Sequence, residues 1–174
     1  MVEILQDGDP VLRQIAKPVL VKDIPAEKIQ RLLKDMRKAL NSQDDGVAIA
    51  APQIGASLRI FMISGKVFSS RNTHDDQHEI QEDITCINPI FTKISGDKKL
   101  IAEGCLSVRP FYGHVRRATR ASIEAYDEQG KKFTMDGTGL LAQIFQHEID
   151  HLDGILFIDK AKNIHESTPE EEFK

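Results

Sequence analysis

The chain has 174 residues, of which 40% are hydrophobic and 29% charged, and its formal net charge at pH 7 is −4. These values are typical of one globular domain, and the acidic balance argues against a dedicated nucleic-acid binder, so we expect no DNA partner. No apolar run is long enough to cross a membrane, and the first residues lack the basic-then-apolar pattern of a signal peptide. The chain has only two cysteines, Cys86 and Cys105, so a disulfide framework is not expected and a cytoplasmic location is favoured.

The first half of the chain predicts one long helix, a buried strand and a loop. Asp9 and Pro10 favour a turn or short helical segment, because proline suits the first helical position. Residues 26–42 carry apolar side chains at helical spacing among charged ones, which predicts an amphipathic helix. Residues 58–63 predict a buried strand, and the polar residues 65–83 predict an exposed loop. Two histidines of this loop are four residues apart but are expected to be solvated: His74 and His78.

The second half predicts strands followed by a helix. Four segments have the apolar content and turn-forming boundaries of strands: residues 85–91, 99–103, 113–126 and 131–135. A helix is then expected from a cap at Asp136 or Thr138 through Leu152, ending at Gly154. The charged residues from about position 160 predict a frayed tail. Residues 1–174 therefore predict a single α+β domain in which mostly antiparallel β-sheets pack around a central C-terminal metal-binding helix.

The predicted C-terminal helix contains the sequence HEIDH. His147 and His151 are four residues apart, so on a helix they lie on one face and both imidazoles can bind one metal ion. Glu148 follows the first histidine, where a carboxylate can exchange a proton with a metal-bound water but is poorly placed as a third ligand. The pattern is typical of metal-dependent hydrolases.

Two histidines leave a catalytic metal site short of a third protein ligand. A histidine six residues after His151, as in metzincins, is excluded because Phe157 occupies that position. A glutamate about 20 residues downstream, as in thermolysin-like proteases, would be Glu171, which lies near the chain end without an apolar face to hold it. Cys105 is the third candidate, because a thiolate beside two imidazoles suits Zn²⁺ or Fe²⁺. The ordinary alternative is a small buried core residue, which is the interpretation we favour for Cys86.

A further segment, residues 46–55 with the sequence GVAIAAPQIG, is dense in small residues. On its own it favours a tightly packed strand and turn. Together with residues 103–107 (EGCLS) and 146–151 (QHEIDH), it resembles the peptide deformylase family, which carries these three blocks in this order. The resemblance extends from Gly8 to Phe157 and implies a compact α+β fold. It also implies a metallohydrolase that removes the N-terminal formyl group from the initiator methionine of new polypeptides and releases formate.

The resemblance assigns roles to residues of this chain in three groups. The implied metal ligands are Cys105, His147 and His151. The implied catalytic groups are Glu148 as acid/base, with the side chain of Gln53 and the backbone N–H of Leu106 as donors to the oxyanion. The implied substrate-binding residues are Gly46, Val47, Ala48 and Gly104, consistent with recognition of a peptide at an exposed strand edge.

The resemblance further implies one divalent cation, Fe²⁺ in preference to Zn²⁺, Ni²⁺ or Co²⁺. The implied partners are N-formylmethionyl peptides of nascent chains. The resemblance also allows transient contact with the ribosome, and no membrane partner is expected. Two positions depart from the family pattern: Ala48 stands where a second glycine is usual, and Arg109 where proline is frequent. Neither departure removes a ligand or the base, so we expect the chemistry to be retained and the fit of the substrate to differ.

Other interpretations use the same residues. The metal helix could belong to a metallopeptidase, which would cleave unformylated peptides, or to a structural metal site, which would need a fourth protein ligand. The basic residues 116–120 could contact nucleic acid, although the acidic net charge favours a solvated strand face. Either Arg116 or Arg117 can pair with Glu103, which would otherwise be an ordinary surface charge.

Overall fold

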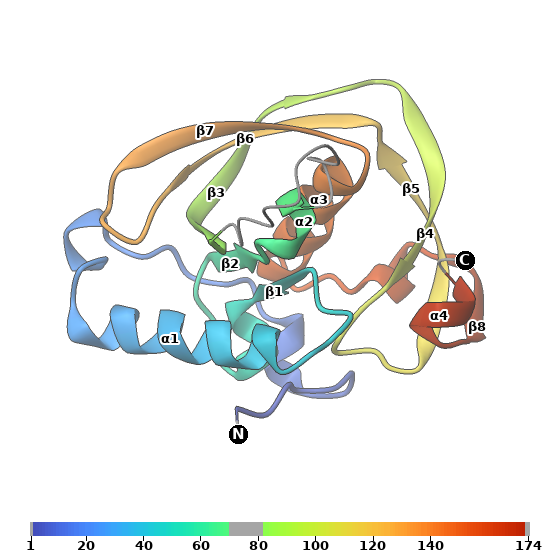
Figure 1. Cartoon of the computed structure of the whole chain (residues 1–174), viewed down its shortest axis with the longest axis horizontal. Helices are drawn as coiled ribbons and strands as arrows, with labels where there is room; N and C mark the ends of the chain where they lie inside the picture. Colours follow the sequence, from blue (N-terminus) through green and yellow to red (C-terminus); the bar gives the residue numbers. More distant parts are fainter. Residues whose placement is uncertain (1, 70–81, 173–174) are drawn as a thin grey trace.

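The computed structural model describes residues 2–69 and 82–172 (Figure 1). The α-helices are α1 (Glu27–Asn41), α2 (Lys66–Ser69), α3 (Leu140–Leu152) and α4 (Pro169–Glu172). The 3-10 helices are η1 (Pro10–Arg13), η2 (Val21–Asp23), η3 (Ala51–Ile54) and η4 (Phe157–Asp159). The strands are β1 (Ala48–Ala50), β2 (Ile60–Ile63), β3 (Ile84–Ile94), β4 (Lys98–Gly104), β5 (Phe111–Ala118), β6 (Arg120–Tyr126), β7 (Lys132–Thr138) and β8 (Lys162–Glu166).

The strands form two antiparallel sheets. One has the order β1-β2-β3-β6-β7 and the other the order β4-β5-β8. In Figure 1, β3, β6 and β7 arch over α3, while β4, β5 and β8 lie at the end of the molecule that carries the C-terminus. Among the described residues, β1 and β4 are the end strands of their sheets, so each has one edge available for further strand pairing.

Helices cover both faces of the sheet at β2. Alternate residues of a strand point to opposite faces. Phe61 and Ile63 therefore pack with the buried residues of α3, whereas Ile60 and Met62 pack with the apolar stripe of α1. All four residues of β2 are fully buried, as expected for a strand between two layers of helix. The predicted α+β fold with a central C-terminal helix is confirmed.

Between residues 84 and 154 the individual elements agree with the sequence predictions with two corrections. Residues 113–126 form two strands instead of one, because the chain turns at Thr119 and β5 and β6 enter different sheets. Asp136 and Thr138 belong to β7 and do not cap α3, whose N-cap is Gly139 without a side-chain hydrogen bond. Gly154 follows the last turn of α3 with a φ of 73°, a left-handed conformation that favours glycine, and so ends the helix as predicted.

The tail also differs from the prediction. A frayed end was expected from about residue 160, but β8 pairs with β5 and is followed by α4. The five side chains of β8 are all exposed, so its position depends on backbone hydrogen bonds that an apolar pattern does not reveal. The predicted loop at 65–83 begins with α2, and both loop histidines fall outside the described residues. No helix within residues 2–69 and 82–172 has the length and apolar character needed to cross a bilayer.

Candidate metal centre and active site

Helix α3 and the residue after β4 bring three ligand atoms together. His147 and His151 lie one helical turn apart, and their Nε2 atoms are 3.2 Å from each other. Cys105 comes directly after β4, and its Sγ lies 3.2 Å from the His151 Nε2. One ligand atom from each of the three residues lies within 4.8 Å of the others. The structure therefore gathers the three residues that the sequence singled out as metal ligands.

The donor set fits a divalent transition-metal ion. A thiolate and two imidazole nitrogens are ligands that Zn²⁺ and Fe²⁺ accept. Within the described residues the group contains no fourth histidine, cysteine or carboxylate, so a bound ion would keep a position for water or substrate. The rejected candidates lie elsewhere, since Phe157 is a buried core residue and Glu171 is exposed on α4.

A buried ion pair supports the first histidine. The Glu103 Oε1 lies 2.7 Å from the His147 Nδ1, and both Glu103 oxygens accept hydrogen bonds from Arg117, at 2.6 and 3.0 Å. Arg117 also donates to Asp150 at 2.6 Å. A carboxylate at Nδ1 fixes the tautomer that leaves Nε2 free to bind a metal. The partner of Glu103 is Arg117 and not Arg116, because adjacent strand residues point to opposite faces.

This arrangement corrects the prediction of a solvated arginine face on residues 116–120. The side chains of Arg117 and Glu103 are only 4% and 3% exposed, whereas Arg116 and Arg120 are exposed. Burial raises the pKa of Glu103, but His147 and Arg117 outweigh it and hold that pKa well below its usual range. Glu103 is therefore ionised at neutral pH.

The two histidines have opposite electrostatic environments. Burial lowers the pKa of His147, but the charge of Glu103 and hydrogen bonds to Cys105 and Glu103 raise it well above the usual value. Burial and the neighbouring His147 hold the pKa of His151 well below the usual value, which keeps its imidazole neutral. A proton and a divalent cation would compete for the His147 Nε2, so a cation bound at this centre would displace a proton.

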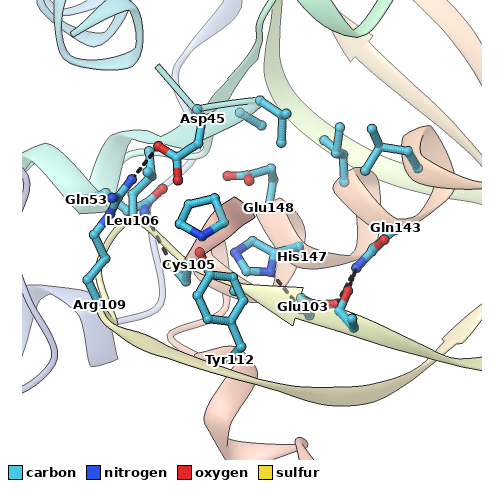
Figure 2. A pocket seen from close by; sticks show the side chains of 18 residues that line it. Asp45, Gln53, Glu103, Cys105, Leu106, Arg109, Tyr112, Gln143, His147 and Glu148 are labelled. Carbon is cyan, nitrogen blue, oxygen red and sulfur yellow. Dashed lines mark hydrogen bonds and ion pairs between the residues drawn. The ribbon is translucent and has the colours of Figure 1, made fainter. Parts of the chain in front are cut away.

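Glu148 lies beside the three ligand atoms with an unusual environment for a carboxylate. The residue is 4% exposed, and its Oε2 has no hydrogen-bond partner in the described part of the chain. Burial raises the pKa of Glu148 to about 7, and the charge of Glu103 adds to this while His147 and Arg117 oppose it. In Figure 2 the carboxylate points into the pocket. A carboxylate with this pKa can accept and return a proton near neutral pH.

Gln53 and Leu106 flank Cys105. The Gln53 Nε2 donates to the Ser107 Oγ at 3.0 Å and lies 3.6 Å from the Cys105 Sγ, while its Oε1 accepts from the Ala50 N–H at 2.8 Å. The backbone N–H of Leu106 makes no hydrogen bond within the described residues. The sequence prediction did not include Ser107, which is fully buried and positions the Gln53 amide.

These residues open into a cavity of about 390 Å³ between β1 and β4. The cavity lining includes all four residues predicted to border the substrate: Gly46, Val47, Ala48 and Gly104. It also includes Arg109, whose departure from the family pattern was expected to alter the fit of the substrate, and residues that were not predicted: Asp45, Ala102, Tyr112, Leu140, Gln143, Ile144 and Pro169.

The helical spacing could have identified part of the unpredicted lining. Gln143 and Ile144 are four and three residues before His147, so they share its helix face. Tyr112 could not have been identified this way, because its position depends on the pairing of β5 with β4, where Tyr112 lies opposite Gly104. A Cβ added to Gly104 would come within 2.4 Å of the Tyr112 ring, so this position needs glycine.

Comparisons with known proteins assign the chain to one family. The family model for polypeptide deformylase matches residues 1–167. The chain belongs to the peptide deformylase family. A peptide deformylase from Heliobacterium modesticaldum is 40% identical over 97% of both chains. This deformylase is thus a hydrolase of the family that removes the N-terminal formyl group from nascent polypeptides, and the family prediction from the sequence is confirmed.

Solved structures support the same assignment. The crystal structure of a peptide deformylase from Legionella pneumophila is 39% identical, with a TM-score of 0.79 over 94% of this chain and 87% of that chain. A class I type b peptide deformylase from Acinetobacter baumannii, bound to Met-Ala-Ser, is 30% identical, with a TM-score of 0.79 over 92% and 98%. The deformylase fold therefore extends over almost the whole chain.

Proposed function

We propose that this deformylase hydrolyses the formyl amide of N-formylmethionyl peptides at a centre of one divalent metal ion held by Cys105, His147 and His151. The observation that supports the proposal most is the convergence of three ligand atoms within 4.8 Å beside the buried Glu148 carboxylate. Fe²⁺ is the proposed ion, with Zn²⁺, Ni²⁺ and Co²⁺ as alternatives that the same ligands accept. When bound, the cation would polarise the formyl oxygen and lower the pKa of water.

Glu148 transfers the proton in this proposal. Its Oε2 accepts a proton from the attacking water as the oxygen bonds to the formyl carbon. The same carboxyl group then gives the proton to the amine nitrogen as the carbon–nitrogen bond breaks, which releases formate and a free N-terminal methionine. The pKa of about 7 suits both directions of transfer.

The Gln53 side chain and the Leu106 backbone N–H stabilise the negative charge on the formyl oxygen. Leu106 offers an N–H that makes no hydrogen bond within the described residues, and the Gln53 Nε2 lies beside Cys105. One oxyanion donor typically contributes about 3–4 kcal/mol to transition-state stabilisation. Ser107 holds the Gln53 amide in place before the substrate arrives.

The peptide binds as an additional strand between β1 and β4. Gly46, Val47 and Ala48 line one wall of the cavity and Gly104 the other, and both strands end their sheets in the described structure. The apolar wall of α3, formed by Leu140 and Ile144, accepts the methionine side chain. The Acinetobacter relative carries Met-Ala-Ser, a peptide that begins with methionine.

Nascent chains are the proposed substrates, so we propose a cytoplasmic location and transient contact with the ribosome. We further propose that residues 1–174 form one catalytic domain. The alternative function, a metallopeptidase on the same helix, requires cleavage of unformylated peptides.

The decisive experiment measures formate release from formyl-Met-Ala-Ser by anaerobically purified protein, before and after treatment with a chelator and after return of Fe²⁺. We expect activity that is lost with the metal and restored by it. Cleavage of unformylated Met-Ala-Ser with no formate release would refute the proposal and support the metallopeptidase.

Two variants test the residue roles. Glu148→Gln should keep the metal and lose nearly all turnover, because the amide cannot accept the proton. Cys105→Ala should lower metal content after dialysis, whereas Cys86→Ala, a matched change at a buried cysteine outside the ligand group, should leave metal content unchanged. An active Glu148→Gln protein, or full metal content in Cys105→Ala, would contradict these roles.

A further inference from the structure

An ion pair joins the two walls of the cavity at its rim. The Arg109 Nη2 donates to the Asp45 Oδ1 at 2.6 Å, and both residues line the cavity. Asp45 directly precedes the Gly46 wall, and Arg109 lies four residues after Cys105 on the opposite wall. Figure 2 shows the pair at the edge of the pocket, away from Glu103 and Gln143. Their side chains are 29% and 42% exposed, so a bound peptide and solvent can both reach them.

The ion pair lies downstream of the reacting amide. Strand β1 leads from Ala48 towards Gln53, whose side chain lies 3.6 Å from Cys105, so the metal end of the cavity is at the Gln53 end. Asp45 is three residues before Ala48, which is at most about 10 Å of extended chain. A peptide that pairs with β1 and carries its formyl group at the metal end therefore passes the ion pair with its second or third residue.

Charge at the rim limits what Arg109 can bind. Pro169 of α4 lines the same cavity, and the next three residues of the chain are glutamates. Burial raises the pKa of the Tyr112 hydroxyl, and the nearby charges of Asp45, Glu172 and Glu170 raise it further while Arg109 opposes them. An acidic substrate side chain would meet these like charges, whereas a neutral backbone carbonyl would not. The guanidinium has five N–H donors, and its one ion-pair contact in the described structure leaves donors for such a carbonyl.

We propose that Arg109, held in place by Asp45, donates a hydrogen bond to the backbone carbonyl of the third residue of the substrate. Arg109 is then a positioning residue that makes this deformylase favour longer formylated peptides. This inference rests on the proposed function, because it takes the formyl group to react at the Cys105 centre.

The test compares two uncharged substrates, formyl-Met-Ala amide and formyl-Met-Ala-Ser amide, by formate release. We expect kcat/KM of the unaltered enzyme to be about tenfold higher for the longer peptide, the effect of one charge-assisted hydrogen bond. In Arg109→Gln this ratio should fall to about one, and in Asp45→Asn it should fall partway. Arg109→Lys, which keeps the charge, should retain part of the ratio. Arg31→Gln, at an exposed arginine on α1 that does not line the cavity, should leave the ratio unchanged.

The ratio separates substrate positioning from a general effect on folding, because a partly unfolded enzyme loses activity on both peptides equally. Equal kcat/KM for the two peptides in the unaltered enzyme, or a tenfold ratio that persists in Arg109→Gln, would overturn the inference and leave the deformylase activity intact. Absence of formate from both peptides in metal-loaded protein would instead overturn the proposed function, and the inference with it.

Discussion

The buried ion pair behind the metal centre permits a quantitative prediction. Arg117→Met removes the guanidinium that makes two hydrogen bonds to Glu103 and one to Asp150, in a place where Arg117 is only 4% exposed. Removing one partner of a buried pair leaves the other charge uncompensated and costs about 3–5 kcal/mol. In this variant Glu103 keeps His147 and Gln143 as partners, and Asp150 keeps Lys160. We therefore expect a loss at the lower end of this range, about 3 kcal/mol in the free energy of unfolding.

Equilibrium urea unfolding of the metal-free protein measures this loss directly. For a chain of this size, about 3 kcal/mol corresponds to a fall in Tm of roughly 6–12 °C. Arg116→Met is the matched control, because Arg116 is the adjacent residue on the exposed face and should change the free energy of unfolding by no more than about 0.5 kcal/mol. Equal stabilities of the two variants would refute the reasoning. Adding Glu103→Gln to Arg117→Met should restore part of the stability, since it removes the charge left unpaired.

Three further predictions follow from the same structure. Gly154→Ala should lower the free energy of unfolding by about 1–3 kcal/mol, because φ is 73° at this position and the added Cβ would lie 2.7 Å from the Arg13 carbonyl oxygen. Gly96→Ala is the control, because no atom lies within 4 Å of a Cβ added there. Gly104→Ala should displace the Tyr112 ring and lower kcat/KM, and a second change of Tyr112→Leu should recover activity if crowding is the cause. Removal of the metal ion by a chelator should lower the Tm of the protein, because an ion present at 100 times its Kd stabilises the folded state by about 2.7 kcal/mol. An unchanged Tm would contradict a metal centre in the folded protein.

Local patterns predicted much of the fold. The apolar stripe of residues 26–42 gave α1 nearly to its ends, since helical periodicity is a property of neighbouring residues. The turn residues at 127–130 correctly separated two strands, now β6 and β7. The break at Thr119 and the pairing of β8 were missed, because sheet membership and backbone pairing depend on distant segments.

The sequence by itself determined the three blocks, the spacing of His147 and His151 on one helix face, and Cys105 as a candidate third ligand. The three blocks stand in the order that the peptide deformylase family carries, and the resemblance to that family rests on this order. Only the tertiary structure decided that Glu103 is paired with Arg117 and ionised although buried, that Tyr112 packs on Gly104, and that Asp45 reaches Arg109 across the cavity. Each of these contacts joins separate segments, and its geometry depends on strand register and on burial, which no local pattern of residues encodes.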